Sequence, residues 1–394
     1  MFRVTRKILP VGQGAFYFEQ LQDGEETKNV IYDCGSTTKN HKAILTQQIR
    51  HLLPEQSVID VLFISHFDKD HVNGIEELCK HFDVKKIIIP EFDRQYLSIY
   101  FLFNFLSEKA SVSNYSINYG AVDSFSSFLQ ENAERIVQVS PYNPNSDLDE
   151  RPQNIHEIKT NVPILSGRQL TLGGGLYIPI NFGVTKKQVD DFKNAFNREF
   201  HVYILSNDST ERNKIKDIIA QNSAKIKGIY KALVGDVNAH SMIVYSGAVN
   251  GYDFYFMHID MEYCCNVYSP HCYHHCTHDC RHKVSCLYTG DANLDAARLK
   301  VVKKILKTKI DTIGVLQLPH HGSKRNLDYK TYKKIMMSKG ECQKLITFAS
   351  FGTSNQYHHP SYSLIEDIMI EDDCFFGVTE RLGPLEMEIN HLFV

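Results

Sequence analysis

The chain has 394 residues, with 43 lysines and arginines against 46 acidic residues, which gives a formal charge of −3. This length is ample for a sizeable core and allows one large or two ordinary domains. The near-neutral balance excludes a protein that coats nucleic acid by bulk charge, and 43% hydrophobic residues exclude a disordered chain. The longest apolar runs are strand-sized, so we expect no membrane span, no secretory leader and a cytoplasmic location.

The first ninety residues alternate between strand and helix patterns. Residues 2–8 and 15–21 are expected to be strands joined by a glycine-rich turn at 12–14, and residues 29–32 a third strand. The next expected elements are a helix over 41–53, a strand over 58–65, a helix over 72–81 and a strand over 85–89. This order predicts layered α/β packing.

The centre of the chain is less regular. We expect a helical or irregular insert at about 91–235, although a strand pattern returns within it over 162–182. Strands expected over 242–245 and 252–257 precede a second insert, the Cys/His-rich segment 258–285. The remaining expected elements are strands over 285–289, 312–318, 344–350 and 385–393 and helices over 294–307 and 362–370.

The most informative motif is a loop directly after an apolar strand, Ser65-His66-Phe67-Asp68-Lys69-Asp70-His71. In an extended loop the side chains of His66 and Asp68 point to one side. Asp70 and His71 are adjacent and must diverge, so they can serve a second ion. Imidazole and carboxylate suit zinc, manganese or iron, and two ions about 3.5–4 Å apart can share a bridging water. The motif therefore favours a two-metal site over a solvated acidic loop.

Three further polar clusters follow apolar strands. They are Thr289-Gly290-Asp291, Leu318-Pro319-His320-His321-Gly322-Ser323 and Tyr357-His358-His359-Pro360-Ser361. Each alone has an ordinary interpretation as a turn, a helix cap or a solvated loop. Four such clusters at strand ends are much less probable by chance, so together they predict one site.

The order of these motifs resembles the metallo-β-lactamase fold. Within that fold, the sequence looks like the hydrolase domain of the DNA-uptake protein ComEC and related phosphoesterases. The likeness also takes in Val11-Gly12-Gln13-Gly14-Ala15, Asp33-Cys34-Gly35, Asn238-Ala239-His240-Ser241 and His359-Pro360. It implies an α/β protein, a four-layer αββα sandwich with inserts, in a single domain over residues 1–394. ComEC's membrane channel is not part of the likeness, so we expect a free-standing hydrolase with no membrane partner.

The resemblance implies a ligand set for two divalent ions, zinc or manganese. His66 and Asp68 would hold the first ion. The second would be held by Asp70, His71 and His321, with Asp291 bridging. Asp68 stands where most relatives have His, and this harder oxygen ligand favours manganese.

Other roles are carried over from the same resemblance. The usual third His of the first site has no plain counterpart, and His240 is the candidate, against an alternative as a strand-end polar residue. The candidate catalytic residues are Asp70, which could receive a proton, His320, where a phosphate would lie, and His359, as a phosphate contact or a ligand. Asp33 would orient a loop histidine by a hydrogen bond.

The function expected from these residues is a dinuclear metal-dependent hydrolase, a phosphodiesterase or nuclease acting on nucleic acid or a nucleotide. One alternative is a hydrolase of a small ester, thioester or lactone, which the same fold supports. Another is a metal-binding scaffold without activity, against which the intact ligand set argues. Nucleic acid or a nucleotide is therefore the expected partner, and the sequence does not specify any protein partner.

The second insert carries a dense Cys/His tract. Six of the ten cysteines fall within residues 264–286, interleaved with five histidines. In the reducing compartment expected here, metal binding is favoured over disulfides, although the spacing matches no standard zinc finger. We predict one additional structural zinc, with Cys272, Cys276, Cys280 and Cys286 as candidate ligands. The alternatives are a redox or unpaired-thiol insert and a flexible loop.

Replacing Cys272, Cys276 and Cys280 by Ser should lower the zinc content by about one ion and leave hydrolysis largely intact. Metal analysis of protein purified under reducing conditions checks this. Equal zinc content in the wild type and the triple variant would leave an ordinary Cys-rich loop.

Overall fold

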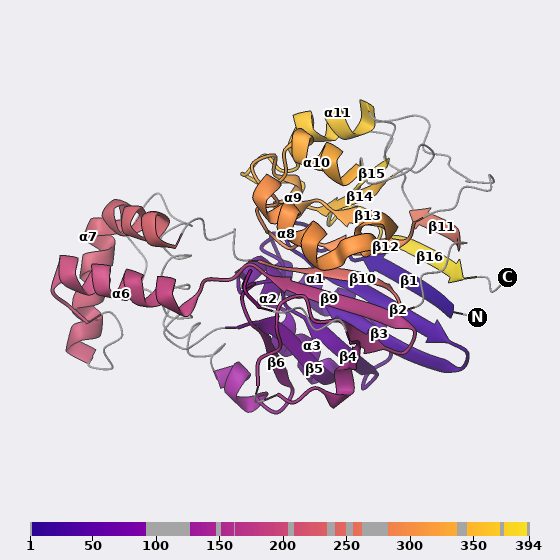
Figure 1. The fold of residues 1–394 in the computed structure, drawn as a ribbon, viewed down its shortest axis with the longest axis horizontal. Coiled ribbons are helices and arrows are strands. Elements are labelled where there is room, and N and C mark those ends of the chain that lie inside the picture. The colour runs from indigo at the N-terminus through magenta and orange to yellow at the C-terminus, as the bar shows by residue number, and fades with distance from the viewer. Residues whose placement is uncertain are drawn as a thin grey trace.

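The computed structural model describes residues 2–91, 127–146, 151–160, 162–203, 209–234, 241–249, 255–261, 283–336, 345–370 and 374–391. In these ranges, two mixed sheets stack face to face and helices cover their outer faces (Figure 1). This is the mixed α/β sandwich expected from the sequence, and that prediction is confirmed. Among the described helices, none is long and apolar enough to cross a membrane.

The first sheet has eight strands in the order β11-β16-β1-β2-β3-β4-β5-β6. Its N-terminal strands are antiparallel, whereas β3 to β6 run parallel to one another. The bounds are β1 (Phe2–Ile8), β2 (Tyr17–Asp23), β3 (Glu26–Tyr32), β4 (Val58–Phe63), β5 (Asp83–Pro90), β6 (Ile136–Val139), β11 (Tyr255–Met261) and β16 (Leu385–His391).

The second sheet also has eight strands, in the order β15-β14-β13-β12-β10-β9-β8-β7. Its strands β12 to β15 are parallel, and β10 joins them antiparallel to β12. The bounds are β7 (Gln153–Asn154), β8 (Leu170–Leu172), β9 (Gly175–Asn181), β10 (Met242–Ala248), β12 (Ser285–Tyr288), β13 (Ile313–Gln317), β14 (Ile346–Ser350) and β15 (Cys374–Val378).

The helices connect these strands. They are α1 (His41–Leu52), α2 (Lys69–Val72), α3 (Ile75–His81), α6 (Lys186–Phe200), α7 (Ser209–Leu233), α8 (Ala296–Leu306), α9 (Pro319–Gly322), α10 (Tyr329–Met336) and α11 (Tyr362–Ile370). The helix expected over 72–81 is divided into α2 and α3 near Gly74, whose backbone N–H donates to the Cys34 carbonyl at 2.9 Å instead of continuing a helix. A Cβ at Gly74 would lie 2.7 Å from the Cys34 sulfur.

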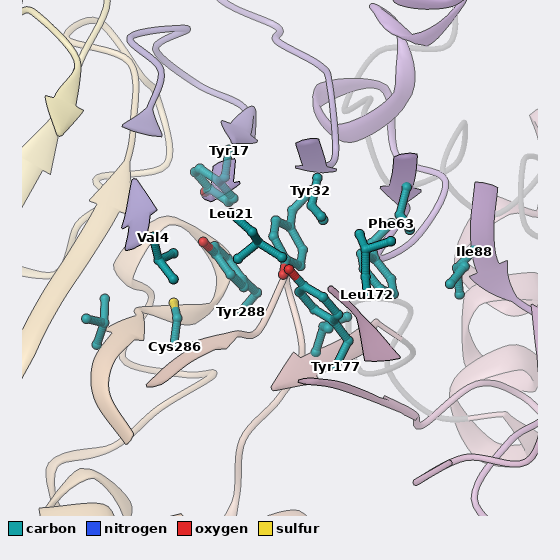
Figure 2. Close-up of a cluster of buried hydrophobic side chains, with 14 of the residues drawn as sticks. Val4, Tyr17, Leu21, Tyr32, Phe63, Ile88, Leu172, Tyr177, Cys286 and Tyr288 are labelled. Atoms are coloured by element: carbon teal, nitrogen blue, oxygen red, sulfur yellow. The ribbon is translucent and has the colours of Figure 1, made fainter. Parts of the chain in front are cut away.

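Alternation along the strands builds the layers. In β4, Val61 and Phe63 face the core between the sheets, whereas Leu62 faces the helices outside. In β13, Val315 points inward and Leu316 outward in the same way. Figure 2 shows the inner core, which is rich in tyrosine and phenylalanine side chains. Each sheet therefore has two apolar faces. One face packs against the other sheet, and the outer face is covered by helices.

The region 91–235 is not uniformly helical or irregular. Residues 136–181 supply β6 to the first sheet and β7 to β9 to the second. Several of these strands have only two to four residues, too few to show a period in the sequence. Helices α6 and α7 extend away from the sandwich (Figure 1) and pack on each other through Phe192 and Tyr230, whose ring centroids are 5.4 Å apart.

Candidate metal centre

The predicted site residues meet where strands of both sheets end. His66, Asp68, Asp70 and His71 follow β4 of the first sheet. Asp291 follows β12, and His320 and His321 follow β13, in the second sheet. Parallel neighbouring strands end at the same edge of a sheet, so stacking the two sheets brings these loops together.

A first donor group consists of His66, His71 and Asp291, all buried, with one ligand atom from each lying within 4.8 Å of the others. The Nε2 atom of His71 is 3.2 Å from Oδ1 of Asp291, and that of His66 is 3.8 Å from Oδ2. Both Nε2 atoms and Oδ1 of Asp291 lack a hydrogen-bond partner among the described residues. Buried polar atoms without a partner are costly, and a divalent cation at their centre would satisfy all three.

A second donor group consists of Asp70, His71 and His321. The Nε2 atom of His321 lies 3.2 Å from Oδ2 of Asp70. These are the three residues expected around the second ion. The two groups adjoin because both contain His71, whose free Nε2 can ligate one ion, whereas the two carboxylate oxygens of Asp291 could serve both ions of a pair.

Hydrogen bonds on the far side of each imidazole fix its orientation. Nδ1 of His71 lies 2.8 Å from Oδ2 of Asp33, and Nδ1 of His321 donates to the Ser350 carbonyl at 2.8 Å. The Ser65 hydroxyl donates to Asp33 and therefore accepts from Nδ1 of His66. Each of these partners can accept a proton from Nδ1, and the tautomer with the proton there leaves the Nε2 lone pair available to a metal. The expected orienting role of Asp33 agrees with this geometry.

Two glycine motifs near the N-terminus, residues 11–15 and 33–35, hold residues 65–71 by close backbone contact. Residues 65–71 carry four of the candidate ligands and are called the metal loop below. Ala15 donates its backbone N–H to the Asp70 carbonyl at 2.9 Å, and Cys34 donates to that of His71 at 2.8 Å. A Cβ at Gly35 would lie 2.5 Å from the backbone of both Asp70 and His71. Only glycine permits this approach, so Gly35 helps to hold the backbone of Asp70 and His71 in place.

The electrostatics of the centre favour ionised carboxylates. Burial acts to raise the pKa of Asp291, but the charges of His320 and His71 hold it well below its usual range. At Asp70 burial acts in the same direction, and the hydrogen bond from His321 lowers the pKa below normal. Burial lowers the pKa of His71, yet Asp291 and Asp33 raise it well above its ordinary value. The site is therefore built to hold positive charge.

The turn α9 presents its two histidines in an unusual backbone conformation. His320 and His321 have φ values of 50° and 55°, in the left-handed region that side chains other than glycine rarely adopt. Nε2 of His320 lies 3.6 Å from Oδ2 of Asp291, and its Nδ1 lies 3.1 Å from Asn326. Strain of this kind is tolerated where the surrounding structure holds it, and it concentrates at functional sites.

His359 lies next to this turn but in neither donor group. Its ring centroid is 5.2 Å from that of His320. Burial, together with the charges of His320 and His321, lowers the pKa of His359 to about 4, so the ring is neutral near pH 7. Asp68 also stands outside the donor groups, with Oδ2 3.5 Å from Nε2 of His66.

Two predicted sites fall wholly or partly outside the described residues. His240 lies there, although its neighbour Ser241 accepts the backbone N–H of Asp291 at 3.2 Å. Cys272, Cys276 and Cys280 lie there too. Cys286 is described and lies buried in the core between the sheets (Figure 2), where burial raises the pKa of its thiol. Zinc binds the thiolate, so this environment argues against Cys286 as its ligand.

The sequence interpretation missed residues that support the ligands. Gln317 accepts the backbone N–H groups of Thr289 and Gly290 at 2.9 and 3.1 Å, which fixes the turn before Asp291. Ser65 was noted only as part of the loop. A buried glutamine in the otherwise apolar strand β13 is the pattern that could have revealed Gln317.

Comparison with known proteins bears on the fold. Residues 13–159 match the family model of the metallo-beta-lactamase superfamily, and this segment contains the metal loop. No curated protein matches the chain. Among solved structures, it is similar to a HARLDQ-motif mutant of a metallo-beta-lactamase from Cronobacter sakazakii. That likeness has 11% identity and a TM-score of 0.29 over 93% of this chain and 92% of the other. Residues 13–159 are thus similar to the metallo-beta-lactamase superfamily, and the two-sheet sandwich is consistent with that fold.

Proposed function

We propose that the protein is a dinuclear metal-dependent phosphodiesterase acting on nucleic acid or a nucleotide. Two adjoining donor groups that share His71 support a two-ion centre. The motifs that resemble ComEC-type hydrolase domains favour a phosphodiester over a carboxylic ester. The observation that carries this choice is the positive charge that directly follows α9, the turn with His320 and His321.

That charge comes from Lys324 and Arg325, which are exposed and follow the strained turn α9. The cationic charge of Arg325 reaches His359, where it helps to lower the pKa. Arginine recognises phosphate through a planar fork of donors, whereas a neutral ester or lactone has no anionic group for it to bind. An anionic substrate therefore fits the surface next to the ligands.

One set of residues would hold the metal ions, and another would contact the substrate and transfer protons. His66, His71, Asp291, Asp70 and His321 would hold the ions, with Asp68 beside His66. Bound there, two divalent ions would polarise phosphoryl oxygens and lower the pKa of a water.

The remaining residues would act on the substrate and its protons. His320, with Nε2 3.6 Å from Asp291, and the neighbouring His359 lie where they can contact a substrate held at the ions. Asp70, whose side chain is 18% exposed, is the carboxylate placed to receive a proton.

The test compares two ester classes on metal-replete protein. We expect hydrolysis of bis(4-nitrophenyl) phosphate and of labelled DNA or RNA, single- or double-stranded, to exceed that of 4-nitrophenyl acetate. Arg325→Ala should raise the KM for the phosphodiester about tenfold, because it removes a charge-assisted hydrogen bond. Arg198→Ala changes another exposed arginine, on α6, and is the matched control, which should not change the KM.

The alternatives give different results. Preferential hydrolysis of the acetate or of lactones, indifferent to Arg325→Ala, would establish the small-ester enzyme instead. Metal binding without turnover of either ester class would establish a scaffold.

A further inference from the structure

We propose that Tyr357 is a specificity residue that stacks on a nucleobase next to the phosphate held at the metal centre. This inference rests on the proposed phosphodiesterase function and deepens it. The substrate class it names is a nucleoside phosphate, either free or as one unit of a nucleic acid.

The position of Tyr357 supports this role. Its ring is nearly parallel to that of His359, with an interplanar angle of 13° and centroids 6.2 Å apart. His359 is in turn 5.2 Å from His320, whose Nε2 approaches Asp291 to 3.6 Å. Two ring-to-ring steps therefore lead from the ligands to Tyr357. A nucleotide bound with its phosphate at the centre can extend along this path.

The turn that carries Tyr357 is firmly held. Asn355 closes it at both ends, because its amide donates to the carbonyls of Gly352 and His359 and its oxygen accepts the backbone N–H of His359. Just after the turn, Ser361 donates its N–H to the Gly322 carbonyl at 2.9 Å. The turn is thus fixed to α9, the element that presents His320 and His321.

The exposure of Tyr357 is notable because its backbone is held in this way. Its side chain is 63% exposed. Single exposed aromatic residues are common on protein surfaces and need no explanation by themselves. An aromatic ring on a fixed turn beside a phosphate-binding surface is different, because it can stack on a base at little entropic cost. Stacking tolerates any base, since every base has a π-face.

The first test uses two substrates with the same leaving group, thymidine 5′-(4-nitrophenyl phosphate) and methyl 4-nitrophenyl phosphate. Tyr357→Ala should lower the ratio of their kcat/KM values about tenfold, the usual effect of losing one base–aromatic stack. Tyr357→Phe keeps the ring and should preserve the ratio. Tyr362→Ala removes a tyrosine that is 65% exposed five residues away, and it should also preserve the ratio.

The second test measures binding without catalysis. Calorimetry measures the dissociation constants of thymidine 5′-monophosphate and methyl phosphate. In Tyr357→Ala the affinity for the nucleotide relative to that for methyl phosphate should fall about tenfold, whereas Tyr362→Ala should keep the wild-type ratio. If Tyr357→Ala weakens the binding of oligothymidylate by the same factor, the site takes nucleic acid. If it weakens the binding of the mononucleotide alone, the site takes free nucleotides.

Unchanged ratios in both assays would overturn the role of Tyr357 and leave the phosphodiesterase proposal intact. If no phosphodiester is hydrolysed, the phosphodiesterase proposal fails, and the binding ratio still decides whether Tyr357 contacts a base.

Discussion

Asp291→Asn should reduce phosphodiester hydrolysis more than about 100-fold and lower the bound metal, with the fold intact. Asp291 is the carboxylate between His66 and His71, and Oδ1 has no hydrogen-bond partner among the described residues. The amide keeps the shape of the side chain but removes the negative charge on which a cation at this point depends. Losing a direct ligand should cost more than the 10–100-fold typical of residues that only orient ligands.

The measurements are initial rates, metal content by mass spectrometry, and circular dichroism as a check on folding. Asp70→Ala should behave in the same way, because Asp70 contributes to the second donor group. Asp60→Asn is the control, since Asp60 is equally buried but serves the backbone N–H of Asn29 at 2.9 Å. More than about a tenth of wild-type activity in Asp291→Asn or Asp70→Ala would refute the two-metal assignment.

The sequence was sufficient to predict that the candidate ligands lie together, because their loops follow apolar strands. The run before His66 and the one before His320 are strands β4 and β13, and both are buried. Strand ends at one edge of a sheet converge, so residue type and position together predicted the constellation. The layered α/β fold followed from the same alternation of strands and helices.

The finer structure of the site was not readable in this way. The bond from His321 to the Ser350 carbonyl joins groups that are distant in sequence and carries no motif. The close approach of Gly35 to the metal loop depends on how β3 and β4 pair, which periodicity does not specify. Of the expected first-ion ligands, His66 joins a donor group with His71 and Asp291, and Asp68 lies just outside that group with Oδ2 3.5 Å from Nε2 of His66.

The core between the sheets also contains a feature that hydrophobic patterning does not predict. Arg6 and Glu19 form a buried ion pair, with side chains 2% and 0% exposed. The Arg6 guanidinium also donates to the Val284 carbonyl at 2.6 Å. The hydroxyl groups of Tyr32, Ser246 and Tyr288 donate to the Glu19 carboxylate at 2.8–3.2 Å. All of these partners of the Glu19 charge lie inside the sandwich.

Glu19→Ala should lower the free energy of unfolding by about 3–5 kcal/mol, because it leaves the Arg6 charge buried without a counter-ion. The urea midpoint should fall while the m-value stays constant. Glu386→Ala breaks the part-exposed pair with Lys7, 2.8 Å apart on the same sheet, and should cost at most about 1 kcal/mol. The double variant Arg6→Met/Glu19→Leu removes both charges and should recover most of the loss. Equal losses in Glu19→Ala and Glu386→Ala would show that the buried pair is not what stabilises the join between the sheets.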